Sequence, residues 1–416
     1  MNTYESEAVT DMLEESGRYR ATDGRADIII INSCMVTEES EKKAAKMIRR
    51  VKRENPGCTV LICGCMGQMV PEKCADIGAD IVTGNVSRKE IITLLDDYYS
   101  KKEPIIDKKI HEKGEKIEVL APHAYRNLTR ANLKIEDGCD CYCSYCIIPY
   151  ARGHVRSMEP EEVKRQAMAL VSAGHREIVL TGINIGMYGR DVGKTLFDAV
   201  KAVKDAGADR IRLGSLEIDL LTNETIKKLA EIDGFCPHFH TSLQSGSDTV
   251  LKRMNRHYTA DEYYETVKLI RETFENPSIT TDVIVGFAGE TEEEFLESAE
   301  FLKKVGFAKV HVFPYSMREG TAGALMKNQV PACEKKKRAK IMGDIASELS
   351  RKFLESQLDT CHEVLFETCE NGLWFGHTEN YIYVSVKSDE NLKNQIKKVK
   401  IKSVSEETWL ADGILV

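Results

Sequence analysis

The chain has 416 residues, of which 42% are hydrophobic, so it can bury a large core and is expected to form two or three domains. Its 66 acidic and 58 basic residues give a formal net charge of -8, so a nucleic acid would have to bind local basic patches and not a global positive field. No apolar run is long enough to span a membrane, and the first residues lack a secretory signal pattern. We therefore expect a soluble, cytoplasmic protein with no membrane partner.

The first hundred residues alternate helical and strand patterns. Short apolar runs at 27–32, 59–62 and 80–83 predict strands that are buried on both faces, and residues 38–52 between the first two predict a helix. This alternation predicts an α/β fold with a doubly wound parallel sheet.

In such a sheet, functional groups gather just past the carboxyl ends of the strands. Cys34 and Cys65 stand at two of these ends. We assign residues 1–100 to this first domain, and the Lys-, Glu- and Pro-rich residues 101–127 to a solvated linker.

Six strand-like runs separated by helical patterns follow the linker. They cover residues 132–136, 178–181, 210–213, 238–243, 279–285 and 308–313. Six βα units predict an open, partial form of the eight-unit barrel, with its chemistry at the carboxyl-end loops. We assign residues 128–350 to this second domain.

The last part of the chain has a β pattern. It follows a helix predicted at 333–358, and its strands are predicted at 363–367, 373–376, 381–386 and 397–402. Alternation with turns between the strands predicts a small β-barrel in a third domain, residues 351–416. Its last strands combine Lys and aromatic side chains, as a platform for single-stranded RNA does, but an ordinary surface strand has the same composition.

Four of the 13 cysteines lie close together, at Cys139, Cys141, Cys143 and Cys146, which favours metal ligation over disulfides. Cys139, Cys143 and Cys146 form a C-x-x-x-C-x-x-C motif that can ligate three irons of a 4Fe-4S cluster and leave the fourth iron open. A zinc site is the alternative, but structural zinc needs a second pair of ligands, and none lies nearby. Four other cysteines stand alone and are predicted to be packing residues: Cys236, Cys333, Cys361 and Cys369.

This motif, with Tyr145 just before its third cysteine, resembles that of the radical S-adenosylmethionine superfamily. The segment 146–157 narrows the resemblance to the methylthiotransferases. Similar segments at 180–184, 242–246, 282–287 and 313–316 extend it over nearly the whole chain. The resemblance implies that the second domain is a radical S-adenosylmethionine core and that the third is a TRAM-like RNA-binding barrel. Cys141 stands where relatives usually have asparagine, so an extra thiol is expected beside the cluster.

The resemblance also implies a mechanism. The open iron is expected to bind S-adenosylmethionine, so that an electron from the cluster releases a 5′-deoxyadenosyl radical that removes hydrogen from an inert carbon. Gly182 resembles part of the family's cofactor cradle, and Tyr145, Ser215, Glu217 and Gln244 are implied cofactor contacts. For Glu217, an ordinary acid at a helix N-terminus is the alternative.

Members of the family carry a second 4Fe-4S cluster, held by three cysteines of the N-terminal domain. Cys34 and Cys65 match the second and third of these ligands, whereas the first would precede Met1, together with the first strand of the sheet. We expect Met1 to be an internal methionine of a longer reading frame. The alternative is a protein that lacks one ligand, with Cys63 or Cys74 as a substitute.

Three substrates divide this family. The segments 2–7, 180–186 and 311–316 look closest to the enzymes that act on N6-threonylcarbamoyladenosine at tRNA position 37, beside the anticodon, and that give its 2-methylthio derivative at C2. The alternatives are N6-isopentenyladenosine in tRNA and an aspartate of a ribosomal protein. A non-catalytic iron-sulfur RNA-binding protein is the alternative from another class.

The resemblance implies three partners: the tRNA anticodon stem-loop, a small electron donor such as flavodoxin or ferredoxin, and a sulfur donor that the sequence does not identify. Basic residues near the motifs are candidates for contacts with RNA phosphates, although each could be a plain surface charge. These candidates are Arg152, Arg156, Lys252, Arg253 and Arg256.

Overall fold

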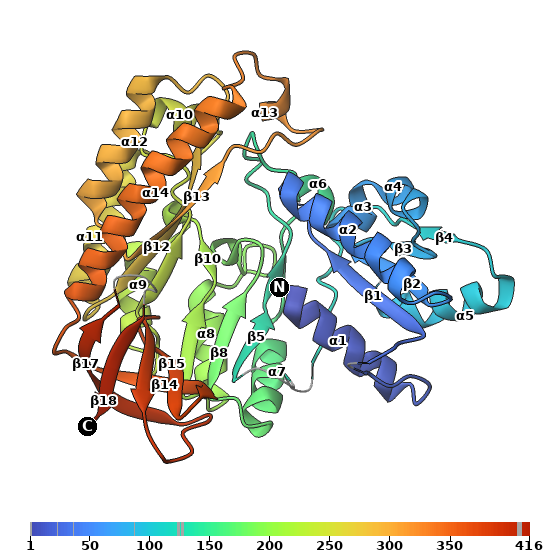
Figure 1. Cartoon of the computed structure of the whole chain (residues 1–416), viewed down its shortest axis with the longest axis horizontal. Coiled ribbons are helices and arrows are strands. Elements are labelled where there is room, and N and C mark those ends of the chain that lie inside the picture. The colour runs from blue at the N-terminus through green and yellow to red at the C-terminus, as the bar shows by residue number, and fades with distance from the viewer. Residues whose placement is uncertain are drawn as a thin grey trace.

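The computed structural model describes residues 2–22, 24–35, 37–86, 88–122, 125, 129–405 and 410–416. Figure 1 shows three parts: an N-terminal α/β part, a central curved sheet covered by helices, and a small C-terminal β-barrel. No helix within the described residues is both long and apolar enough to cross a membrane.

The N-terminal part is a parallel sheet with helices on both faces. Its strands, in spatial order, are β1 (Ile28–Ser33), β2 (Thr59–Gly64), β3 (Ile81–Thr83) and β4 (Ile105–Asp107). Its helices are α1 (Asn2–Glu15), α2 (Glu38–Glu54), α3 (Cys65–Met69), α4 (Pro71–Asp76), η1 (Arg88–Glu90) and α5 (Ile91–Lys101). Val60 and Ile62 of β2 pack with Ile48 of α2, whereas Leu61 packs with Val9 of α1 on the other face. The predicted doubly wound sheet is confirmed.

One strand of this sheet lies in the segment that the sequence analysis assigned to a linker. β4 pairs in parallel with β3, with Ile105 opposite Ile81. Three residues are too few to show a periodicity, and β4 directly follows Lys, Glu and Pro, which are rare in strands. Residues 105–107 therefore belong to the first sheet and not to a linker.

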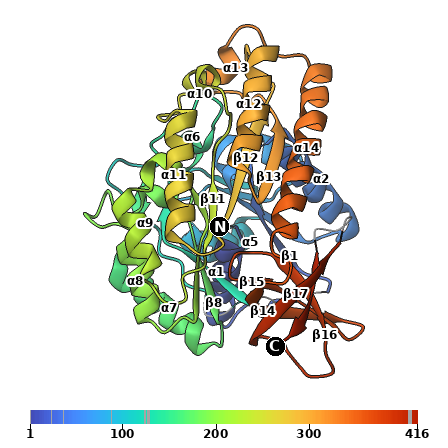
Figure 2. The ribbon, with the colours of Figure 1, turned by 90° about the vertical axis from the view of Figure 1, so that its left-hand side faces the viewer.

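The central part confirms the six predicted strands. They run parallel in the order β5 (Arg130–Lys134), β8 (Glu177–Thr181), β9 (Arg210–Leu213) continued by β10 (Ser215–Leu216), β11 (His238–Thr241), β12 (Ser278–Val285) and β13 (Lys309–Pro314). The helices are α7 (Pro160–Ser172), α8 (Leu196–Asp205), α9 (Asn223–Ala230), α10 (Asp248–Arg253), α11 (Ala260–Thr273), α12 (Glu292–Val305), α13 (Ala322–Leu325) and α14 (Ala332–Glu355). Figure 2 shows α9, α11, α12 and α14 along the outer side of the curved sheet.

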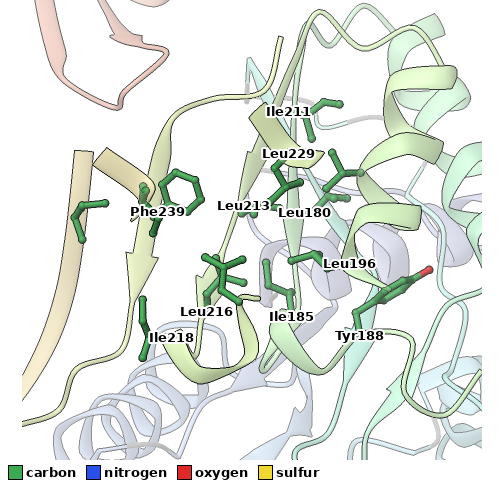
Figure 3. Close-up of a cluster of buried hydrophobic side chains, with 14 of the residues drawn as sticks. Leu180, Ile185, Tyr188, Leu196, Ile211, Leu213, Leu216, Ile218, Leu229 and Phe239 are labelled. Carbon is green, nitrogen blue, oxygen red and sulfur yellow. The ribbon is translucent and has the colours of Figure 1, made fainter. Parts of the chain in front are cut away.

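Apolar packing fixes these strands against their helices. Leu180, Ile211 and Leu213 from the strands are fully or almost fully buried and lie in one cluster with Leu196 of α8 and Leu229 of α9 (Figure 3). Burial of a side chain of this size contributes roughly 1.5 to 3 kcal/mol, so the cluster holds the strand ends in a fixed arrangement.

The C-terminal part is a closed barrel of five strands. Their spatial order is β14 (Cys361–Glu370), β15 (Leu373–Thr378), β16 (Tyr383–Lys387), β18 (Ala411–Leu415) and β17 (Ile396–Val404). β18 was not predicted, because its Asp-Gly pair interrupts the alternation of apolar residues. Arg212 of β9 joins this barrel to the core, since it pairs with Glu177 at 2.7 Å and donates to the carbonyl oxygens of Thr378 and Glu379.

A buried network of charges joins the N-terminal sheet to the core. The fully buried carboxylate of Glu5, on α1, lies 2.9 Å from Arg152 and 3.0 Å from both Arg88 and Lys134. Arg152 and Lys134 also pair with Asp137. Burial alone would raise the pKa of Glu5, but Arg152, Arg88 and Lys134 together hold it well below its usual value.

The substitution Glu5→Gln leaves the three buried cations with two carboxylates: Asp137, which pairs with Lys134 and Arg152, and Glu118, which lies 3.5 Å from Arg88. We expect it to lower the free energy of unfolding by about 3 to 5 kcal/mol, as breaking a buried ion pair does. Urea denaturation followed by circular dichroism would measure the loss. The matched control is Asp96→Asn, which breaks the exposed pair between α5 and Arg18 in the same N-terminal part and should change little. Equal losses in the two variants would contradict the role of Glu5.

Candidate active site at the cysteine loop

The four central cysteines lie in a loop whose base is a short antiparallel ladder. β6 (Glu136–Asp137) leads into the loop and pairs with β7 (Arg156–Ser157), which leaves it, and α6 (Ile148–Arg152) lies between them. Gly138 has a φ of +87°, and a Cβ there would lie 1.9 Å from the carbonyl oxygen of His154. Only glycine fits this turn, which starts the loop.

The thiols of the loop are withdrawn from solvent. Cys139, Cys141 and Cys143 are buried, Cys146 is half-buried, and all four lie in one small apolar cluster. Burial raises the pKa of Cys146 to about 12, so binding of iron must displace its proton. Three thiols of one buried loop fit the donor set of a 4Fe-4S cluster. Across the described residues, no three His, Cys, Asp or Glu side chains converge closely enough to hold a single metal ion.

Gly182 follows β8 and lies against the buried carboxylate of Glu136. The Oε2 atom of Glu136 accepts the backbone N–H groups of Ile183 and Asn184 at 2.8 and 2.9 Å. A Cβ on residue 182 would lie 2.4 Å from this oxygen, so only glycine permits the contact. Burial raises the pKa of Glu136 well above its usual value. Glu136 could not be singled out from the sequence, where its only signal is an acidic residue in a strand just before the cysteines.

Arg256 brings together three residues that the sequence analysis selected. Its Nη1 atom lies 2.6 Å from Glu217 Oε1, 3.3 Å from Cys143 Sγ and 3.5 Å from the Tyr145 hydroxyl. Arg256 thus joins Cys143, Tyr145 and Glu217, which were selected separately from the sequence. Arg256 itself was a candidate for a contact with RNA phosphate or a plain surface charge, and both interpretations are wrong, because its side chain is 1% exposed.

The other four candidates for contacts with RNA phosphate differ in how exposed their side chains are. Arg152 and Arg156 are buried and ion-paired, so neither can reach RNA. Arg253 pairs with Glu294, and Lys252 is exposed. Among these candidates, burial leaves only Lys252 freely accessible.

A pocket of about 190 Å³ lies beside Cys146. Tyr145 and Gln244 line it from the core, together with Asp282 of β12, and Thr37, the N-cap of α2, lines it from the N-terminal part. The pocket thus lies where the cysteine loop, the strand ends and the first sheet meet, as expected for parallel strands.

Ser215 lies elsewhere. It lines a separate cavity of about 390 Å³ with Arg130, Arg212, His238 and His240, and no residue is shared with the pocket beside Cys146. The structure therefore brings the other four predicted cofactor contacts to the cysteine loop or to the strand that leads into it, and places Ser215 apart from them.

Cys34 and Cys65 follow neighbouring strands at the same edge of the first sheet, since Ser33 is paired with Gly64. Asn85 links Cys65 to the cysteine loop: its Nδ2 atom lies 3.7 Å from Cys65 Sγ and donates to the carbonyl oxygen of Ala151 at 2.9 Å. The two groups of cysteines therefore lie on either side of one interface.

Cys63 and Cys74, the possible substitute ligands, lie in two apolar clusters on opposite faces of the first sheet. Neither cluster contains Cys34 or Cys65. Burial raises the pKa of Cys63 to about 11 and that of Cys74 to about 12, close to the value for Cys146, so it is their position in these clusters, and not the acidity of their thiols, that separates them from Cys34 and Cys65. The prediction for the isolated cysteines holds for buried Cys236 and is wrong for the other three, which are exposed: Cys333, Cys361 and Cys369.

Comparison with known proteins gives the family. A model of the radical SAM superfamily matches residues 133–302, and one described as uncharacterized protein family UPF0004 matches residues 1–84. The chain is 39% identical over 411 residues to the threonylcarbamoyladenosine tRNA methylthiotransferase MtaB of Bacillus subtilis, covering 96% of this chain and 91% of that protein. It is 34% identical to the tRNA-2-methylthio-N(6)-dimethylallyladenosine synthase of Caldicellulosiruptor saccharolyticus, covering 100% and 90%.

Solved structures support the fold. The radical S-adenosylmethionine methyltransferase TsrM of Kitasatospora setae, with cobalamin and a 4Fe-4S cluster bound, superposes with a TM-score of 0.58 at 13% identity, covering 77% of this chain and 74% of that one. The relatives and the family models agree over both the N-terminal sheet and the core. The chain therefore belongs to the family of radical S-adenosylmethionine tRNA methylthiotransferases, transferases that use a 4Fe-4S cluster and S-adenosylmethionine.

Proposed function

We propose that the chain methylthiolates C2 of N6-threonylcarbamoyladenosine at tRNA position 37. The observation that carries the proposal is the 39% identity, over nearly the whole chain, to a relative named for this substrate. The pocket beside Cys146 combines polar Gln244 and Ser316 with apolar Ile284 and Phe313, so its lining suits either a threonylcarbamoyl or a dimethylallyl group. We therefore base the choice of substrate on the identity to this relative and not on the pocket lining.

In this proposal Cys139, Cys143 and Cys146 hold the catalytic cluster. A cluster bound there would supply the electron that cleaves S-adenosylmethionine. Tyr145 and Gln244 line the pocket beside Cys146, where they would contact the bound cofactor or substrate.

The remaining parts of the chain take supporting roles in the proposal. Cys34 and Cys65 contribute ligands to a second 4Fe-4S cluster on the other side of the interface. The C-terminal barrel is TRAM-like and binds the anticodon stem-loop. A small protein of the flavodoxin or ferredoxin kind supplies electrons. The reaction takes place in the cytoplasm. For the domains, we propose residues 1–100, 128–350 and 351–416, with β4 added to the first.

The ligand assignment predicts a difference between neighbouring cysteines. Single Ser variants at Cys139, Cys143 or Cys146 should lose the bound cluster, because each removes one of three ligands. Cys141→Ser in the same loop and Cys333→Ser on α14 should keep it. Iron content and the visible absorbance of anaerobically reconstituted protein measure the outcome. If Cys141→Ser loses iron as Cys143→Ser does, the assigned motif is wrong.

The substrate is tested by mass spectrometry of tRNA nucleosides. Cells that lack this gene should lose 2-methylthio-N6-threonylcarbamoyladenosine and retain its N6-threonylcarbamoyl precursor, and a plasmid copy of the gene should restore the product. A Cys143→Ser copy serves as the control and should not restore it. Loss of the 2-methylthio derivative of isopentenyladenosine would assign the other tRNA substrate, and an unchanged profile would reject both.

A further inference from the structure

The Arg256 guanidinium is held in one orientation beside the cysteine loop. Its Nε atom donates to the Tyr258 hydroxyl at 3.1 Å and its Nη2 atom donates to the carbonyl oxygen of Ser242 at 3.0 Å. Tyr258 in turn donates to the carbonyl oxygens of Ser242 and Leu243. These hydrogen bonds fix the guanidinium so that Nη1 is directed at Cys143 and Glu217.

We propose that Arg256 is a positioning residue that sets the reduction potential of the cluster through Cys143 and holds Glu217 in place. The inference rests on the proposed function only in requiring that Cys143 ligate the cluster. It concerns the electronic state of the cluster and does not depend on which nucleoside is the substrate.

The sign of the effect follows from electrostatics. When the cluster accepts one electron from an external donor, its net charge becomes more negative by one unit, and no bond is broken. A positive charge 3.3 Å from a ligand sulfur stabilises this reduced state, and hydrogen bonds to the sulfurs are known determinants of cluster potentials. Burial strengthens the interaction, because little water screens a side chain that is 1% exposed.

Glu217 opposes this effect. Its carboxylate pairs with Arg256 at 2.6 Å and partly offsets the positive charge that acts on Cys143. Removal of the guanidinium should therefore lower the potential, whereas removal of the carboxylate charge should raise it. If the pair were only structural, the two substitutions would not shift the reduction potential in opposite directions.

The test is a redox titration with dithionite, followed by electron paramagnetic resonance, on the full reconstituted chain without S-adenosylmethionine. Every variant also carries Cys34→Ser and Cys65→Ser, so that only the cluster of the cysteine loop is titrated. Arg256→Gln should make reduction about tenfold less favourable, which corresponds to a midpoint lower by about 59 mV for one electron. Arg256→Lys keeps the charge, so its midpoint should be close to that of the unsubstituted chain. Glu217→Gln should move the midpoint upward. The control Arg253→Gln removes an arginine three residues away that pairs with Glu294, and should leave the midpoint unchanged.

The outcomes separate this inference from the proposed function. A midpoint in Arg256→Gln equal to that of Arg253→Gln overturns the inference, even if Cys143→Ser loses the cluster as proposed. Retention of the cluster by Cys143→Ser overturns the ligand assignment instead. If Arg256→Gln fails to hold iron, Glu217→Gln decides, since an unchanged or lower midpoint in that variant contradicts the inference.

Discussion

The position of the first sheet against the core depends on one buried carboxylate. Glu5 faces cations from three separate elements: Arg88 of η1, Lys134 of β5 and Arg152 of α6. A buried cation without a counter-charge is costly, so these elements are stable only together. Arg88 also donates to Asn85, whose side chain lies against Cys65 and bonds to Ala151 of α6, so the same network holds Cys65 near the cysteine loop. The candidate site exists only where the two parts of the chain meet.

Two glycines beside the cysteine loop occupy positions where no other residue fits. Gly138 and Gly182 stand where a Cβ would collide, with the backbone of His154 and with the Glu136 carboxylate respectively. The Arg256 guanidinium completes the arrangement by joining a cluster ligand to an acidic residue. These contacts fix the start of the cysteine loop at Gly138 and the side chain of Arg256 beside Cys143.

The sequence predicted most of the strands because apolar runs and alternation are local signals. It missed β4 and β18, which are short or interrupted and gain their stability from neighbouring strands. The cysteine motif was evident from its spacing. The contacts of Glu5, Asn85 and Arg256 were not evident, because their partners are distant in the chain: Glu5 and Arg152 are 147 positions apart. Such contacts become visible only once the fold is known.

The most direct test of this account is an anaerobic crystal structure of the reconstituted chain, with iron located by anomalous scattering. We predict an iron cluster ligated by Cys139, Cys143 and Cys146, with one iron open toward the pocket lined by Tyr145 and Gln244 and with Arg256 against Cys143. A single zinc ion in the loop, or a cluster that uses Cys141 in place of Cys143, would contradict the account.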